Sequence, residues 1–298
     1  MSRSTALVAL LGLLAIPAIV TGADYVQELT KWRQDREASL KGDESWLTVA
    51  GLFFLQPGKN TFGSATTNDI VLPSSAPAEA GVFELDGKAV RLRAGSPLMV
   101  NGKPTTAAEL KPAAEGRPAD TLKIGPLTMF VHLSGDRLAI RLRDTNSEIR
   151  RNFTSLKWFP PDEAFKVTAR FEPYATPKPI KVPNILGDFE SYTAPGVVVF
   201  TLDGKEQKLE VYDSGSGANR RFFIVFRDLT SGKETYPAAR FLYADAPVDG
   251  KTVLDFNKAY NPPCAFNPYT TCPLPSEQNR MRVRITAGEL DYHKAATH

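Results

Sequence analysis

The sequence is poor in the residue types that most often carry metal or acid–base chemistry. It has 298 residues but only two cysteines and three histidines. Two cysteines form at most one intramolecular bridge, which excludes a disulfide-framework miniprotein. Three histidines leave few candidates for metal ligands or general bases. We therefore expect no metal site and no cofactor.

A large excess of positive or negative charge is also lacking. The chain has 36 Lys and Arg against 33 Asp and Glu, a formal net charge of +3. Nucleic-acid binding needs a concentrated basic field, so we expect no nucleic-acid partner. Hydrophobic residues make up 42% of the chain, which is enough for a full core and excludes a disordered protein.

Only the amino-terminal segment contains a long hydrophobic run. Residues 1–23 combine Arg3, an apolar stretch over Ala6–Val20 and small residues that end at Ala23. This pattern is typical of a cleaved signal peptide, and the apolar stretch is short for a spanning helix. We expect a secreted or periplasmic protein with no membrane span after cleavage; an uncleaved membrane anchor is the alternative.

The next segment predicts one helix, and the rest predicts strands. Over residues 24–42, apolar side chains recur at helical spacing before Gly42. After it, short β-branched and aromatic runs alternate with turn dipeptides such as Asp86-Gly87 and Asn101-Gly102. Closely spaced strands with such turns indicate antiparallel sheets and not βαβ units. We predict an all-β protein with an N-terminal helix.

An aromatic, proline-terminated segment at Trp158–Pro161 separates two series of strands. We predict a first β unit over residues 43–150 and a second antiparallel sandwich or barrel-like unit over residues 151–292, followed by a tail over residues 293–298. The second series is expected to end with a strand at Met281–Thr286. One continuous sheet system is the alternative.

Residues Leu52–Ser64, Asn68–Pro73 and the later Asn101-Gly102 turn share a strand pattern with a known family. In this pattern the first unit resembles a forkhead-associated domain, which implies an antiparallel β-sandwich. That family recognises phosphothreonine with an arginine after the glycine and a Ser-Arg-x-x-His segment. Here Ser64 takes the place of the arginine, and Pro77–Gly81 offers neither the arginine nor the histidine. Without a guanidinium to pair the phosphate, we do not expect phosphopeptide binding.

A second set of motifs extends over about residues 25–292. The most specific is Asp255–Pro275, which reads DFNKAYNPPCAFNPYTTCPLP, and it is accompanied by Trp46–Leu52, Trp158-Phe159-Pro160 and Glu234-Thr235-Tyr236. In these motifs the chain resembles the bacterial and archaeal family catalogued as domain of unknown function 1684. The resemblance implies no particular reaction, because that family has no assigned activity.

The Asp255–Pro275 segment is also where we expect a binding site. Its prolines exclude a central strand or a helix interior and predict a stiff, ordered loop. Our candidates for contacts to a small molecule, a glycan or a peptide are polar, charged or aromatic residues: Arg240, Asp255, Asn257, Tyr260, Asn261, Tyr269 and Glu289. The alternative is that the polar side chains only satisfy backbone groups of the loop.

Cys264 and Cys272 lie in the same loop. A disulfide between them is the preferred interpretation. A nucleophilic thiolate, a metal pair and two free thiols are the alternatives, although no histidine lies close enough in sequence to suggest a zinc site.

Together these features favour a non-catalytic binding module whose ligand meets the Asp255–Pro275 loop. A hydrolase-like enzyme centred on Asp255, Arg240 and Glu289, or on a cysteine, is the first alternative. A structural envelope component is the second. No Gly-x-Ser-x-Gly motif is present, and a Ser/His/Asp site would have to use His132.

Overall fold

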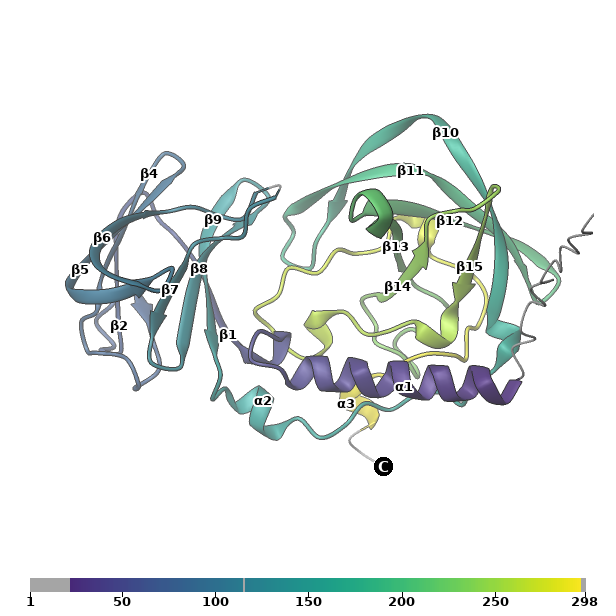
Figure 1. The fold of residues 1–298 in the computed structure, drawn as a ribbon, viewed down its shortest axis with the longest axis horizontal. Helices are drawn as coiled ribbons and strands as arrows, with labels where there is room; N and C mark the ends of the chain where they lie inside the picture. The colour runs from purple at the N-terminus through teal and green to yellow at the C-terminus, as the bar shows by residue number, and fades with distance from the viewer. Residues whose placement is uncertain (1–21, 115, 296–298) are drawn as a thin grey trace, which may run out of the picture.

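The computed structural model describes residues 22–114 and 116–295, and two curled sheets and one long helix dominate it (Figure 1). Both sheets are nearly closed, barrel-like and almost entirely antiparallel. The prediction of an all-β fold with an N-terminal helix is confirmed. The expected signal peptide lies outside the described residues, except for its last two positions.

The first sheet has nine strands in the order β1-β9-β8-β7-β5-β4-β2-β3, with β6 paired to β5. Their bounds are β1 Val49–Phe54, β2 Gly58–Gly63, β3 Ile70–Val71, β4 Gly81–Asp86, β5 Ala89–Val100, β6 Lys103–Leu110, β7 Thr121–Ile124, β8 Leu127–Ser134 and β9 Arg137–Asp144. Phe62 and Phe83 stack in its core. The turn between β5 and β6 places Asn101 and Gly102 at positive φ, as a tight hairpin of this type requires.

The second sheet has six strands in the order β14-β13-β12-β11-β10-β15. Their bounds are β10 Lys166–Pro183, β11 Phe189–Leu202, β12 Lys205–Ser214, β13 Arg221–Phe226, β14 Arg240–Asp245 and β15 Lys251–Asp255. Its core contains Phe200, Phe226 and Phe256, whose rings pack against one another. Two short helices, α2 (Glu148–Asn152) and α3 (Tyr292–Ala295), lie before and after this sheet in the chain.

The strand expected at Met281–Thr286 is absent. Every second residue of this segment is nevertheless buried as expected: Met281, Val283 and Ile285 pack in the core of the second sheet. The segment is held by other partners, however: the Leu229 N–H donates to the Val283 carbonyl, and the Ile285 N–H donates to a buried carboxylate. Alternation therefore predicted the burial of this segment correctly and its pairing incorrectly.

Helix α1 (Gly22–Lys41) runs along the second sheet (Figure 1). The Tyr25 hydroxyl donates to Asp255 at 2.9 Å, and Arg36 pairs with the buried carboxylate of Glu289 at 2.6 Å. These contacts fix α1 against the end of β15 and against Glu289 in the segment near the carboxyl terminus. Within the described part of the chain, α1 and the other helices are too short or too polar to cross a membrane.

Candidate functional site

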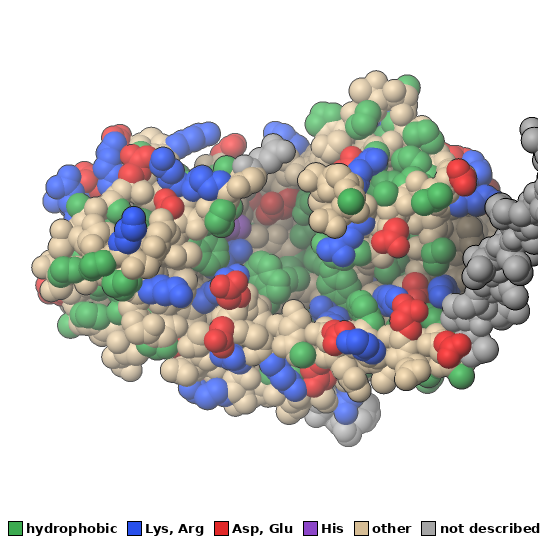
Figure 2. All heavy atoms as spheres, in the orientation of Figure 1, with side chains coloured by type: hydrophobic (Ala, Val, Ile, Leu, Met, Phe, Trp, Pro, Cys, Tyr) green, Lys and Arg blue, Asp and Glu red, His purple; other side chains and the backbone are tan. Residues whose placement is uncertain are grey.

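A cleft of about 900 Å³ lies between the carboxyl half of α1 and strands β13 and β14. Figure 2 shows the molecule hollowed above α1, with hydrophobic side chains gathered in the hollow. The rings of Phe223, Phe241 and Tyr243 line it from the sheet, and those of Trp32 and Trp46 line it from α1 and the segment after it.

The sequence of β13, Arg-Phe-Phe-Ile-Val-Phe, explains why the cleft has an apolar wall. Phe222, Ile224 and Phe226 point into the core of the second sheet. Phe223 and Val225 point the other way and form a second apolar cluster. A strand that is apolar on both faces needs cover on both sides. The Asp255–Pro275 loop supplies part of that cover through Tyr260, Cys264 and Cys272. The cleft, which α1 borders, is the part that stays open.

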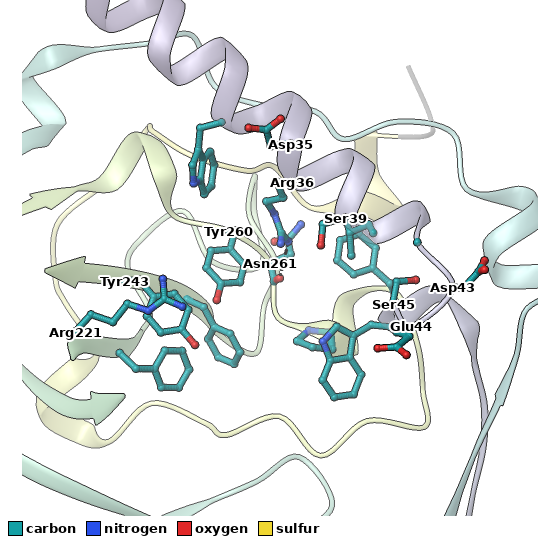
Figure 3. Close-up of a pocket in the computed structure, with 18 residues that line it drawn as sticks. Asp35, Arg36, Ser39, Asp43, Glu44, Ser45, Arg221, Tyr243, Tyr260 and Asn261 are labelled. Atoms are coloured by element: carbon teal, nitrogen blue, oxygen red, sulfur yellow. Dashed lines mark hydrogen bonds between the residues drawn. The ribbon is translucent and has the colours of Figure 1, made fainter. Parts of the chain in front are cut away.

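Two arginines stack on tyrosine rings in the cleft (Figure 3). The Arg221 guanidinium lies 4.1 Å from the ring centroid of Tyr243, and that of Arg36 lies 4.3 Å from the ring of Tyr260. Arg36 is neutralised by Glu289 and also donates to a backbone carbonyl. Arg221 forms no ion pair with another described residue, so its charge remains available to a ligand.

Two ionisable groups in or directly behind the cleft have shifted pKa values. Burial raises the pKa of the Glu289 carboxyl, while Arg36 and Asn261 lower it. Burial and the neighbouring Tyr243 raise the pKa of Tyr260 above its usual range. Among the residues the structure describes, no cluster of three His, Cys, Asp or Glu side chains has the form of a metal site. The cleft thus combines aromatic rings with an unpaired guanidinium, an arrangement suited to holding a ligand.

A smaller groove of about 270 Å³ adjoins the cleft. Trp46, Phe223, Phe241, Tyr243 and Pro263 line both spaces, so the two share a wall. The groove also includes the following residues of β11, β12 and the Asp255–Pro275 loop: Tyr192, Asp213, Ser214, Thr270, Thr271, Cys272 and Pro273.

Cys264 and Cys272 are neighbours in the structure and are both thiols. The Cys264 N–H donates to the Cys272 sulfur at 3.1 Å. Burial alone would raise the pKa of Cys272, but hydrogen bonds with Cys264 and Thr270 and the charge of Arg141 bring it below its usual value. The hydrogen bond to Cys272 and burial raise the pKa of Cys264. The two residues are therefore in contact, and the disulfide stays a prediction.

Three of the seven predicted binding residues lie at the cleft. Tyr260 and Asn261 line it, and the amide of Asn261 also donates to the Leu290 carbonyl at 2.7 Å. Glu289 is buried behind Arg36 and positions that side chain. The loop therefore contributes to the cleft through its first half.

The other four candidates lie elsewhere. Arg240 is fully buried within the second sheet, and Tyr269 is 40% exposed outside the cleft. Asp255 accepts from Tyr25 beneath α1, while the Asn257 side chain pairs with the backbone of Asp162. Arg240, Asp255 and Asn257 thus satisfy polar groups of the fold, as the structural interpretation of the loop anticipates.

Sequence reasoning missed the sheet side of the cleft. None of Arg221, Phe241 and Tyr243 is among the predicted binding residues. The signal that could have found them is the doubly apolar β13 followed by β14, in which Tyr243 interrupts the buried pattern and is 36% exposed.

Comparison with known proteins places the chain in a family. Residues 151–290 match the model described as protein of unknown function DUF1684. An uncharacterized protein of Haloarcula marismortui, solved by NMR, is 32% identical over 47% of this chain and 78% of its own, with a TM-score of 0.41. The FHA domain of FhaA is 18% identical over 31% of this chain and 97% of its own, with a TM-score of 0.21. No curated protein matches. The chain belongs to the DUF1684 family of proteins of unknown function.

Proposed function

We propose that the chain is an exported, non-catalytic binding protein whose small-molecule ligand occupies the cleft between α1 and strands β13 and β14. The observation that carries this proposal is a large, aromatic-walled cleft in which Arg221 lies over the partly exposed ring of Tyr243 without a carboxylate partner. Its volume is within the range usual for ligand sites, and a mostly apolar wall with a few fixed polar groups is their usual composition.

The lining favours a ligand that contains rings and bears polar substituents, such as a sugar unit of a glycan. Tyr243, Tyr260 and Trp46 offer ring faces or edges for stacking. Asp35, Asp43, Glu44, Ser39 and Ser45 provide carboxylates and hydroxyls at the α1 side, where Figure 3 shows them.

The hydrolase-like alternative has less support. Arg240, Asp255 and Glu289 are each paired with a different partner: Asp228, Tyr25 and Arg36 respectively. Catalytic acids and bases need a shared position within reach of one reacting atom. Because each of these three side chains is held by a different partner, a structural role is favoured for each.

A binding screen with a matched pair of tyrosine variants tests the proposal. Metabolites and peptidoglycan fragments are screened by thermal shift against the wild type, and each hit is titrated by calorimetry against Tyr243→Ala and Tyr269→Ala. Tyr243 lines the cleft, whereas Tyr269 is similarly exposed but lies outside it. We expect Tyr243→Ala to weaken binding by about tenfold or more and Tyr269→Ala to leave it unchanged. Equal effects of the two substitutions would contradict a site in the cleft.

Export is tested separately from binding. The segment that ends at Ala23 supports cleavage before Asp24. Expression of the full chain followed by fractionation and amino-terminal sequencing should give a secreted or periplasmic protein that begins at or near Asp24. A cytoplasmic protein that retains Met1 would overturn this part of the proposal and leave the binding test unaffected.

A further inference from the structure

Arg141 is a buried cation that no carboxylate in the described part of the chain pairs with. It lies on β9, and its side chain is directed toward the loop that follows β15. The residue is only 4% exposed. Its Nη2 donates to the His132 ring at 3.0 Å and contacts the Thr271 hydroxyl at 3.5 Å, but it forms no ion pair with any described carboxylate.

The other buried arginine of the described chain shows what this position is missing. Arg240 pairs with Asp228 and donates to the carbonyls of Ile285 and Ala287. Arg36, which is partly buried, pairs with Glu289. Taking a guanidinium out of water is costly unless a partner restores the charge balance. Arg141 has a neutral imidazole and one hydroxyl where the others have a carboxylate.

A second cation near Arg141 makes its charge still less well compensated. Arg143 lies two residues along the same strand, and burial together with that second cation lowers the pKa of Arg141 to about 10. Burial and the charge of Arg141 lower the pKa of His132 to about 4, so its ring is neutral at pH 7 and accepts from Arg141. Cys272 and Glu190 oppose this lowering with some favourable charge, but neither forms an ion pair with Arg141.

This cation adjoins the ligand cleft. Thr271, which contacts Arg141, lines the smaller groove, and Trp46 lines both the groove and the cleft. The Trp46 ring lies 5.5 Å from the Arg141 guanidinium. Thr271 is only partly buried and lines the groove, and the Arg141 guanidinium lies directly behind its hydroxyl, at 3.5 Å.

We propose that the ligand of the cleft carries an oxyanion, such as a carboxylate, phosphate or sulfate, which binds in the groove between Thr271 and Arg141. This rests on the proposed function, because the groove and the cleft share a wall. A guanidinium presents its N–H groups in a fork that matches such an anion, and the Thr271 hydroxyl supplies a further donor. The anion would supply the paired counter-charge that no described carboxylate gives Arg141.

The test uses simple anions and NMR on the mature chain. Sodium sulfate and sodium acetate are titrated at pH 7 against sodium chloride at constant ionic strength, and the His132 ring and Thr271 amide signals are followed. We expect saturable shifts with sulfate, acetate or both, and the tighter of the two indicates whether the site prefers a tetrahedral anion or a carboxylate. Shifts that do not saturate, or that equal those with chloride, would overturn the site.

Three variants locate the anion. Arg141→Met should weaken binding at least about tenfold, whereas Arg91→Met, which removes an arginine paired with Asp86 in the β4–β5 hairpin, should leave it unchanged. Thr271→Val keeps the arginine and should weaken binding by roughly threefold to tenfold, which tests the site even if Arg141→Met does not fold. Unchanged binding in Arg141→Met or in Thr271→Val would contradict the assignment.

The two proposals fail in different ways. If cleft ligands distinguish Tyr243→Ala from Tyr269→Ala but neither anion binds near Arg141, the binding function stands and the anion site is wrong. If sulfate or acetate binds and is lost with Arg141→Met while no ligand responds to Tyr243→Ala, the anion site stands and the cleft proposal is wrong.

Discussion

The molecule buries one arginine, Arg240, in the interior of the second sheet and another, Arg141, beside the cleft. Only Arg240 has a carboxylate among its hydrogen-bond acceptors. Arg240 faces one carboxylate and two carbonyls, whereas Arg141 faces a neutral ring and a hydroxyl. A fold that needs a buried charge for its own stability also supplies the opposite charge. An incompletely satisfied cation next to an open cleft is instead what a ligand site requires before the ligand arrives.

The largest expected effect comes from breaking the satisfied site. Arg240→Met leaves the buried Asp228 carboxylate and two carbonyls without a donor, so we expect a loss of about 3 to 5 kcal/mol in the free energy of unfolding. Urea denaturation of the wild type and the variant measures it. A loss below about 1 kcal/mol would show that the network around Arg240 does not carry this stability.

Acid should lower the free energy of unfolding because of His132, which contacts Arg141 near the cleft. The unfolded ring takes up its proton near pH 6.5, but in the folded protein the ring is protonated only near pH 4. The unfolded state therefore binds more protons in this window, and stability should fall by about 2 to 3 kcal/mol as the pH drops from 6.5 to 4. His132→Gln should remove this part of the pH dependence. Identical pH profiles for the variant and the wild type would contradict the depressed pKa.

Oxidation of Cys264 and Cys272 should stabilise the Asp255–Pro275 loop, which lines both the cleft and the smaller groove. A disulfide between Cys264 and Cys272 closes a short loop, for which the gain is about 2 kcal/mol, reduced by the stiff prolines. Thiol counting before and after reduction, followed by thermal unfolding of both forms, tests it. Two free thiols in unreduced protein purified from the periplasm or the medium would exclude the disulfide, and Cys264→Ser should then have no redox-dependent effect.

The smallest expected effect is on the unsatisfied arginine. Replacing a buried charge that lacks a counter-ion with an apolar side chain of similar length removes a desolvation cost, so Arg141→Met should change the free energy of unfolding by less than about 1 kcal/mol or increase it. This is the direct contrast to Arg240→Met, measured in the same denaturation series. A loss of about 3 kcal/mol or more would mean that Arg141 is a structural residue.

The strand pattern made the fold class predictable from the sequence, because alternation and turn dipeptides are local signals. Asn101-Gly102 lies at a tight hairpin as expected. Strand β6 was not anticipated, since Lys-Pro-Thr-Thr-Ala-Ala-Glu-Leu has weak apolar alternation and only its last residue is buried. The segment Met281–Thr286 is the opposite case, because it has the alternation of a strand but is not one. Alternation indicates which residues are buried, whereas strand pairing depends on which backbone lies alongside.

The candidate site was predictable only in part, for a related reason. Tyr260 and Asn261 belong to a sequence segment that is unusual in itself, and they line the cleft. Arg221 and Arg141 lie on ordinary strands, and their significance comes from what does not face them. The absence of a counter-ion depends on contacts between residues far apart in the chain, such as Arg141 with Thr271, which no local pattern encodes.

The central claim is that the cleft binds a ligand, and one comparison tests it most directly. For the tightest hit of the screen, calorimetry gives the dissociation constant for the wild type, Tyr243→Ala and Tyr269→Ala. We expect the dissociation constant to rise about tenfold or more for Tyr243→Ala and to stay within about twofold of the wild type for Tyr269→Ala. A dissociation constant unchanged in Tyr243→Ala, or raised equally in both variants, would contradict it.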